Sequence, residues 1–184
     1  HKIQKYYRAL MIEQDQRSAH HYFNNNKDVT GKVFVDVGCA EGYSSLEIIE
    51  EAKHVYLFEQ NESWLEAIRA TFEPWKDKVT IVQKYVSNRN SPKEQKLDDF
   101  FRDKPDEHLF IKIEGAERRA LAGCEQLFRD CKKIDFAICT YHLHDDEEVI
   151  SAFLDKHNCT YRNQKGFFRH KIRSVVLRGN KKVN

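Results

Sequence analysis

Residues 33–45 read VFVDVGCAEGYSS, an apolar run that ends at a glycine turn and passes into a helix-like pattern. Branched and aromatic residues in the run predict a buried strand, and the turn that follows it contains Gly38 and Gly42. Ser44 and Glu47 have the S-x-x-E spacing of a capping box, which predicts a helix through about residue 52. The stretch is typical of a strand–turn–helix unit that binds a ligand at its turn.

The alternation of strand and helix continues along the chain. Apolar runs predict strands at 54–59, 79–87, 108–114 and 134–142, and two final strands at 161–170 and 174–179 that pair antiparallel. Helical stripes between the strands comprise Leu65, Ile68 and Phe72; Leu121, Cys124 and Phe128; and Val149, Ile150, Phe153 and Leu154. This order predicts an α/β fold with a mostly parallel sheet that is covered by helices on both faces.

The N-terminal residues have a different pattern. Apolar residues at i, i+3, i+4, i+7 and i+8 predict an amphipathic helix that lays one face on another surface: Ile3, Tyr6, Tyr7, Leu10 and Met11. Tyr6, Tyr7, Tyr22 and Phe23 are candidates for an acceptor pocket, with a place in the core as the alternative. We therefore divide the chain into an N-terminal helix and lead-in, residues 1–30, and a ligand-binding domain, residues 31–184.

Composition excludes several classes of protein. The 184 residues suit one domain, and no apolar run approaches the roughly 18 residues of a membrane helix. Lys plus Arg number 31 and Asp plus Glu 29, so no basic surplus favours nucleic acid as a partner. Five cysteines without CxxC spacing, mostly within apolar patterns, and the absence of a signal-peptide pattern predict reduced thiols and a cytoplasmic protein.

The glycine turn distinguishes between two kinds of ligand. Gly38 and Gly42 form G-x-x-x-G, not the G-x-G-x-x-G of a dinucleotide site, and Asp36 and Glu41 add two carboxylates beside the turn. Negative charge disfavours a pyrophosphate and suits the sulfonium and ammonium groups of S-adenosylmethionine. Glu59, about 23 residues after Asp36, follows the next strand and suits hydrogen bonds from both hydroxyls of a ribose. An ordinary tight turn and a solvated strand-end charge are the alternative interpretations.

Six segments together resemble the FkbM-type family of class I S-adenosylmethionine-dependent methyltransferases: VFVDVGCAEGYSS, VYLFEQNESW, YVSNRN, KLDDFF, FIKIEGAERRALAG and AICTYHLHDDEEVI. The resemblance runs from about residue 33 to residue 177 and implies a Rossmann-like sheet of seven strands, six parallel and one antiparallel. It also implies O-methylation of a hydroxyl on a sugar, polyketide or similar small molecule. The expected cofactor residues are Asp36, Gly38, Cys39, Ala40, Glu41, Gly42, Glu59, Gln60, Tyr85 and Val86.

The fourth strand departs from the family pattern. Family members usually read I-K-x-D-x-E-G-A-E, whereas residues 111–117 read IKIEGAE and are two residues shorter. Either Lys112 takes the aspartate position or the strand has lost a dipeptide. The short motif therefore also allows a domain that binds the cofactor without catalysis.

The end of the fifth predicted strand offers a catalytic base. A hydroxyl acceptor must lose its proton, and His142 ends this strand at the cofactor edge and titrates near neutral pH. Glu114 and Glu117 are second candidates, and Lys112 completes the predicted catalytic set. Capping of the next helix is the alternative role for His142, and a favourable interaction with a helix dipole is the alternative for the two glutamates.

We predict no metal site, because His144, Asp145 and Asp146 are better explained as a solvated helix cap. The acceptor is expected to be a small molecule or saccharide, and a homodimer stays open. A nucleotide-dependent oxidoreductase is the weakest alternative, because Glu41 lies where a pyrophosphate would bind.

Overall fold

One seven-stranded sheet organises the chain in a computed structural model that describes residues 2–104, 107–168 and 171–181. The strand order is β3-β2-β1-β6-β7-β9-β8. Their bounds are Val79–Val82 for β3, His54–Phe58 for β2, Val33–Val37 for β1, His108–Ile113 for β6, Lys133–Cys139 for β7, Lys171–Lys181 for β9 and Cys159–Phe168 for β8. Only β9 runs against its neighbours, so the prediction of a mostly parallel sheet with a C-terminal antiparallel strand is confirmed.

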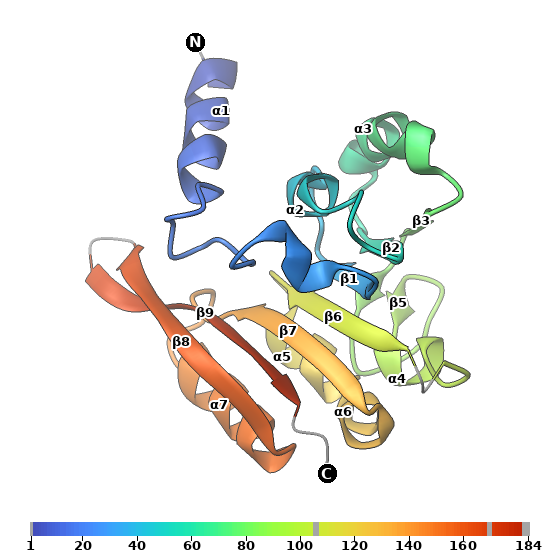
Figure 1. Cartoon of the computed structure of the whole chain (residues 1–184), viewed down its shortest axis with the longest axis vertical. Helices are drawn as coiled ribbons and strands as arrows, with labels where there is room; N and C mark the ends of the chain where they lie inside the picture. Colours follow the sequence, from blue (N-terminus) through green and yellow to red (C-terminus); the bar gives the residue numbers. More distant parts are fainter. Residues whose placement is uncertain (1, 105–106, 169–170, 182–184) are drawn as a thin grey trace.

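Helices cover both faces of the sheet (Figure 1). On one face lie α2 (Tyr43–Glu47), α3 (Glu62–Phe72) and the short 3₁₀ helices Asn26–Val29 and Glu73–Trp75. On the other lie α4 (Leu97–Phe100), α5 (Glu117–Ala122), α6 (Glu125–Asp130) and α7 (Asp146–Lys156). Each face has its own core of buried apolar side chains, as expected for strands that are buried on both sides.

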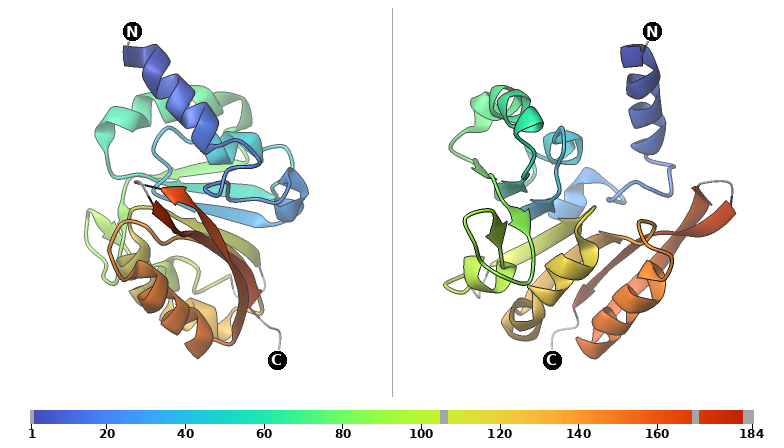
Figure 2. Two further views of the ribbon diagram at one scale, coloured as in Figure 1. Left: turned by 90° about the vertical axis from the view of Figure 1, so that its left-hand side faces the viewer. Right: turned by 180° about the vertical axis from the view of Figure 1, so that it is seen from behind.

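The N-terminal helix α1 (Lys2–Glu13) forms as predicted but extends away from the sheet (Figures 1 and 2). Tyr7 is 62% exposed and Met11 42% exposed, so this part of the apolar stripe is not buried. The side chains of Ile3 and Tyr6 lie outside the described residues. Tyr22 and Phe23, further along the same segment, are buried in the core. No helix in the described ranges has the length and apolar character that a membrane span requires.

The predicted capping box at α2 is wrong. The helix begins after Gly42, whose backbone is left-handed, and it ends at Glu47 instead of near residue 52. Two polar side chains of this helix have other partners: the Ser45 hydroxyl donates to Asp36 (2.7 Å), and the Glu47 carboxylate contacts His21 (3.2 Å). Ser44 thus lies inside the helix and does not precede it as a cap must, and Glu47, its expected capping partner, contacts a distant residue instead.

Two predicted elements are each divided in the structure. The run at 79–87 forms β3 and then β4 (Tyr85–Val86), which pairs with β5 (Glu94–Gln95) in a separate two-stranded sheet. The stripe of Leu121 and Phe128 is shared between α5 and α6, which are separated at Gly123. A Cβ on Gly123 would lie 2.1 Å from the Ser87 carbonyl oxygen, so the helix breaks where two chain segments meet closely.

Candidate active site

The strand order reverses between β1 and β6, and a cavity of about 390 Å³ lies at the carboxyl ends of the strands there. The turn after β1, the end of β2, β4, the end of β6 and the C-terminal end of α1 all line it. Ligands of open α/β sheets bind at this position, beyond the strand ends. The cavity is therefore the candidate site.

The turn after β1 requires its two glycines. Gly38 has φ +76°, and a Cβ there would lie 2.2 Å from the carbonyl oxygen of Glu114. Gly42 has φ +79°, and a Cβ there would lie 2.8 Å from a ring carbon of Phe72. Both positions combine a left-handed backbone with close packing, which only glycine accommodates without strain.

The Glu59 carboxylate connects this turn to the start of α3. One oxygen accepts the backbone N–H of Ala40 (3.0 Å), and the other accepts the backbone N–H of Asn61 (2.7 Å). Glu59 is 9% exposed and lines the cavity. A carboxylate oxygen can accept more than one hydrogen bond, so Glu59 retains capacity for hydroxyl donors from the cavity.

Negative charge dominates the cavity lining. Four carboxylates line it: Glu13, Glu41, Glu59 and Glu114. Two ammonium groups oppose them, those of Lys84 and Lys112. The positive charge of Lys112 is balanced by ion pairs, because its Nζ lies 2.9 Å from Oδ1 of Asp36 and 3.3 Å from Oε2 of Glu114. The lining therefore favours a cation over a phosphate.

Lys112 and Asp36 form a buried ion pair behind the turn. Lys112 is 2% exposed, and it also donates to the carbonyl oxygen of Gly38 (3.1 Å). Burial favours the neutral amine, but Asp36 and Glu114 outweigh this effect and raise the pKa of Lys112. Lys112 is therefore a fixed cation that positions the turn, not a group that gains and loses protons near neutral pH.

Glu114, the first residue after β6, is held by buried hydroxyl groups. Its two oxygens accept the phenol O–H of Tyr22 (2.7 Å) and of Tyr141 (2.5 Å). His20 Nε2 lies 3.4 Å from the same carboxylate. Burial opposes ionisation of Glu114, but Lys112, His20 and Tyr141 hold its pKa well below the usual range. The carboxylate is thus an anion at the cavity wall.

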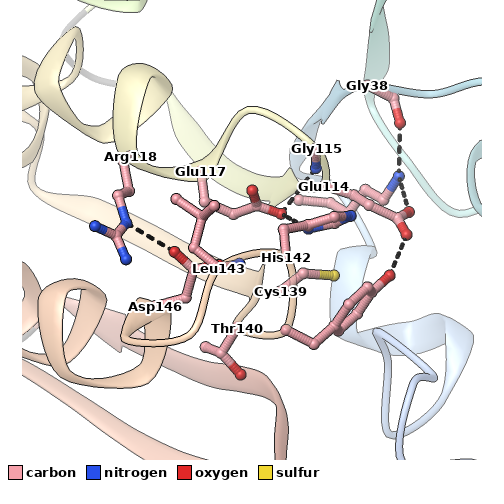
Figure 3. Close-up of polar contacts among 12 residues, drawn as sticks. Gly38, Glu114, Gly115, Glu117, Arg118, Cys139, Thr140, His142, Leu143 and Asp146 are labelled. Carbon is pink, nitrogen blue, oxygen red and sulfur yellow. Dashed lines mark hydrogen bonds and ion pairs between the residues drawn. The ribbon is translucent and has the colours of Figure 1, made fainter. Parts of the chain in front are cut away.

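β7 ends at Cys139, so His142 lies three residues beyond the strand and does not end it as predicted; there it forms a dyad with Glu117. His142 Nδ1 lies 2.9 Å from a Glu117 oxygen that also accepts the backbone N–H of Gly115 (2.8 Å) (Figure 3). The hydrogen bond to Glu117 raises the pKa of His142 above its ordinary value. Its ring packs 4.5 Å from the ring of Tyr141. Donation from Nδ1 to Glu117 leaves Nε2 as the proton acceptor of a neutral ring.

The acids after His142 have structural partners. Arg118 pairs with Asp145 and Asp146, and the second carboxylate also accepts the Leu143 N–H (2.5 Å). Elsewhere, His20, Glu114 and Cys139 each have an atom that could bind a metal ion, and these atoms lie within 4.8 Å of one another. The two Glu114 oxygens, however, already accept hydrogen bonds from Tyr22 and Tyr141.

The structure brings most of the predicted site residues together. Eight of the ten expected cofactor residues line the cavity: Gly38, Cys39, Ala40, Glu41, Glu59, Gln60, Tyr85 and Val86. Lys112 and Glu114 also line it. Asp36 does not, because it is buried between Ser45 and Lys112, and neither Gly42 nor His142 belongs to the lining.

Sequence reasoning missed the contribution of α1 to the cavity. Leu10, Glu13 and Gln14 line it, and the Gln14 side-chain oxygen is buried without a hydrogen-bond partner among the described residues. The other residues missed in the lining are Val37, Tyr43, Ser44, Phe58, Lys84, Gly115 and Ala116. The pattern of α1 indicated only an amphipathic helix, so its position over the cavity had no signal in the sequence.

No model of a known protein family matches this sequence, and no curated protein matches it. Among solved structures, the chain is similar to the methyltransferase FkbM from Methylobacillus flagellatus, with a TM-score of 0.64 and 21% identity over 81% of this chain and 43% of that one. It therefore spans less than half of that protein.

Two further solved structures have the same fold. An rRNA methylase from Streptococcus thermophilus has a TM-score of 0.59 and 16% identity, over 86% of this chain and 92% of that one. The magnesium protoporphyrin IX methyltransferase from Synechocystis, with bound S-adenosylmethionine, has a TM-score of 0.56 and 12% identity, over 84% of this chain and 72% of that one. The Rossmann-like fold of class I methyltransferases, predicted from the sequence, is confirmed.

Proposed function

We propose that this chain binds S-adenosylmethionine in the cavity at the switch point and methylates a hydroxyl of a small molecule or sugar. The observation that carries the proposal is the charge of the cavity: apart from Lys112 and Glu114, which pair with each other and with Asp36, three carboxylates, Glu13, Glu41 and Glu59, face one ammonium group, that of Lys84. Glu59 is our candidate for the ribose hydroxyls, and a pyrophosphate would meet repulsion throughout.

When bound, S-adenosylmethionine supplies a methyl group on a sulfonium, which is an activated leaving group. The protein's part is to hold the acceptor in line and to take its proton. His142 is our candidate base, with Glu117 orienting the ring so that Nε2 accepts the proton. Glu114 is ionised and lines the cavity, but its lowered pKa makes it a weak base. We therefore assign it a positioning role.

We place the chain with the FkbM-type enzymes on the quoted segments and on the similarity to the Methylobacillus flagellatus protein. The shortened fourth-strand motif does not remove the acid from the strand end, since Glu114 directly follows β6 and lines the cavity. A net charge of +2 gives no large basic surplus for RNA binding and so favours a small-molecule acceptor. Because the similar structures include an rRNA methylase, RNA is also tested as an acceptor in the turnover experiment below.

Thermal unfolding with and without ligand tests the cofactor. S-adenosylmethionine at 100 times its dissociation constant should stabilise the fold by about 2.7 kcal/mol, which for a domain of this size raises the Tm by roughly 5–11 °C. NAD at the same concentration should leave the Tm unchanged. No shift with millimolar S-adenosylmethionine would overturn the proposal, and a shift with NAD alone would favour an oxidoreductase.

A second measurement separates an enzyme from a domain that only binds the cofactor. Formation of the demethylated product is followed with panels of sugars, hydroxylated small molecules and RNA. Product formation that depends on a hydroxylated small molecule supports the proposal. Stoichiometric binding without turnover on any acceptor would instead assign this chain as a catalytically impaired binding domain.

A further inference from the structure

A second cavity, of about 360 Å³, lies between the β8–β9 hairpin and the segment before β1. Its lining shares no residue with that of the cofactor cavity. Lys32 precedes β1, Asp135 lies near the start of β7 and Thr160 near the start of β8, so the second cavity lies toward the amino ends of the parallel strands. The two cavities thus lie at opposite ends of the parallel strands, and residues of β8 and β9 line the second.

Two arginines face each other across that wall. Arg162 on β8 and Arg178 on β9 are register partners in the antiparallel pair, and both line the cavity. The next pair on the same face is Thr160 and Asn180, and both of these line the cavity too. Like charges directly opposite each other destabilise a sheet, and the lining holds three cations, Lys32, Arg162 and Arg178, against two acids, Asp28 and Asp135, so an added anion would stabilise this arrangement.

The guanidinium of Arg178 is incompletely satisfied within the protein. Its Nε and Nη1 atoms are buried and have no hydrogen-bond partner among the described residues. Burial and the nearby charge of Arg162 lower the pKa of Arg178 to about 10, while Asp28 acts in the opposite direction. Arg178 as a whole is half-buried, and buried polar atoms in folded proteins nearly always have partners, so its two unpartnered donors point to a partner from outside the protein.

The acids that line this cavity already have other partners. One Asp135 oxygen lies 2.7 Å from Lys32 Nζ and 2.6 Å from His108 Nε2. Oδ2 of Asp28 accepts two hydrogen bonds from Asn24, one from the backbone (2.7 Å) and one from the side chain (3.0 Å), and Asp28 is also the acid of the lining that acts on Arg178. Neither arginine forms an ion pair within the described part of the chain.

We propose that this second cavity binds the phosphate group of a small molecule between Arg162 and Arg178. Guanidinium groups match the oxygens of phosphate with paired hydrogen bonds, and two of them supply more donors than the two oxygens of a carboxylate require. The side chains of Asn24, Thr160 and Asn180 line the same space and offer amide and hydroxyl donors to a polar body. This inference does not depend on the methyltransferase function.

Titration of the whole chain with inorganic phosphate and with glycerol 3-phosphate, followed by NMR amide shifts, tests the site. We expect saturable shifts that map to the lining of the second cavity. Arg178→Gln should weaken binding by at least about tenfold, the loss of one charged hydrogen-bonded contact, and Arg162→Gln should weaken it by several-fold. Lys165→Gln is the matched control, since it removes an exposed positive charge from the same hairpin outside the cavity.

Stability in phosphate-free buffer separates a binding role from a structural one. Removing a like-charge pair and an unsatisfied guanidinium should leave the Tm of Arg178→Gln equal to or above that of the wild type. A lower Tm, or failure to fold, would overturn the proposal by making Arg178 a structural residue. Phosphate binding by Arg178→Gln that matches the wild type would also overturn it. Acetate that binds as tightly as glycerol 3-phosphate, at equal ionic strength, would reject phosphate as the ligand class.

Discussion

Replacing Lys112 by methionine removes the cation that lies between two carboxylates behind the glycine turn. Its Nζ contacts Asp36 at 2.9 Å and Glu114 at 3.3 Å, and it donates to the Gly38 carbonyl oxygen. Asp36 is fully buried, so the variant leaves an uncompensated charge inside the protein. Breaking a buried pair in this way costs about 3–5 kcal/mol. For a domain of this size the Tm should fall by roughly 6–20 °C.

Urea unfolding at pH 7 measures this loss, and a surface pair provides the control. Lys53 lies 2.7 Å from Glu107, but both side chains are substantially exposed, so Lys53→Met should cost about 0–1 kcal/mol. Adding Asp36→Asn to Lys112→Met should recover part of the stability, because the buried charge is then absent. Equal losses for Lys112→Met and Lys53→Met would refute the reasoning.

The pH dependence of Lys112→Met adds a second check. In the wild type the lowered pKa of Glu114 contributes stability above the ordinary glutamate pKa, and this contribution is lost as the pH falls. The variant lacks the Lys112 cation that holds this pKa down. The difference in unfolding free energy between the two proteins should therefore shrink toward acidic pH.

Three further predictions concern the cofactor site and the proposed base. Glu59→Gln should weaken S-adenosylmethionine binding by roughly 10- to 150-fold in calorimetry. It should also lower the stability of the unliganded protein by about 1–2 kcal/mol, because one amide oxygen cannot replace the two carboxylate oxygens that accept the Ala40 and Asn61 N–H groups. Unchanged affinity would show that Glu59 does not bind the cofactor. Glu117→Gln should move the acidic limb of the pH–rate profile to lower pH, since the hydrogen bond that raises the pKa of His142 is weakened, and a limb that stays in place would exclude His142 as the base. Gly38→Ala should lower the Tm more than Gly31→Ala does, because both have positive φ but only Gly38 lacks space for a Cβ.

Local pattern was sufficient for the order of the elements. Apolar runs bounded by turns marked the sheet strands, and the 3.6-residue stripe of Leu65, Ile68 and Phe72 marked α3, where these three side chains are buried. The turn after β1 was also readable, since Gly38 and Gly42 both have positive φ. Hydrophobic periodicity and glycine placement act within a few residues of each other, so these features can be inferred without the fold.

Features that depend on distant partners were not readable. Ser44 and Glu47 have the spacing of a capping box, but Ser44 lies inside α2, and Glu47 contacts the distant His21 in place of a local interaction worth about 1 kcal/mol. Gly123 ends α5 where the Ser87 carbonyl oxygen leaves no room for a Cβ, and this approach of a distant segment has no signal in the local pattern.

The sequence by itself determined that this chain is an α/β protein with an acidic glycine turn at a strand end. Only the tertiary structure decided which acids face the cavity: Asp36 is neutralised by Lys112 behind the turn, whereas Glu13 reaches the lining from a helix far away in the sequence. It also decided that Glu117 orients His142. The physical reason is that the charge and pKa of a side chain depend on its neighbours in space and on its burial, and neither is encoded in the spacing of residues along a strand.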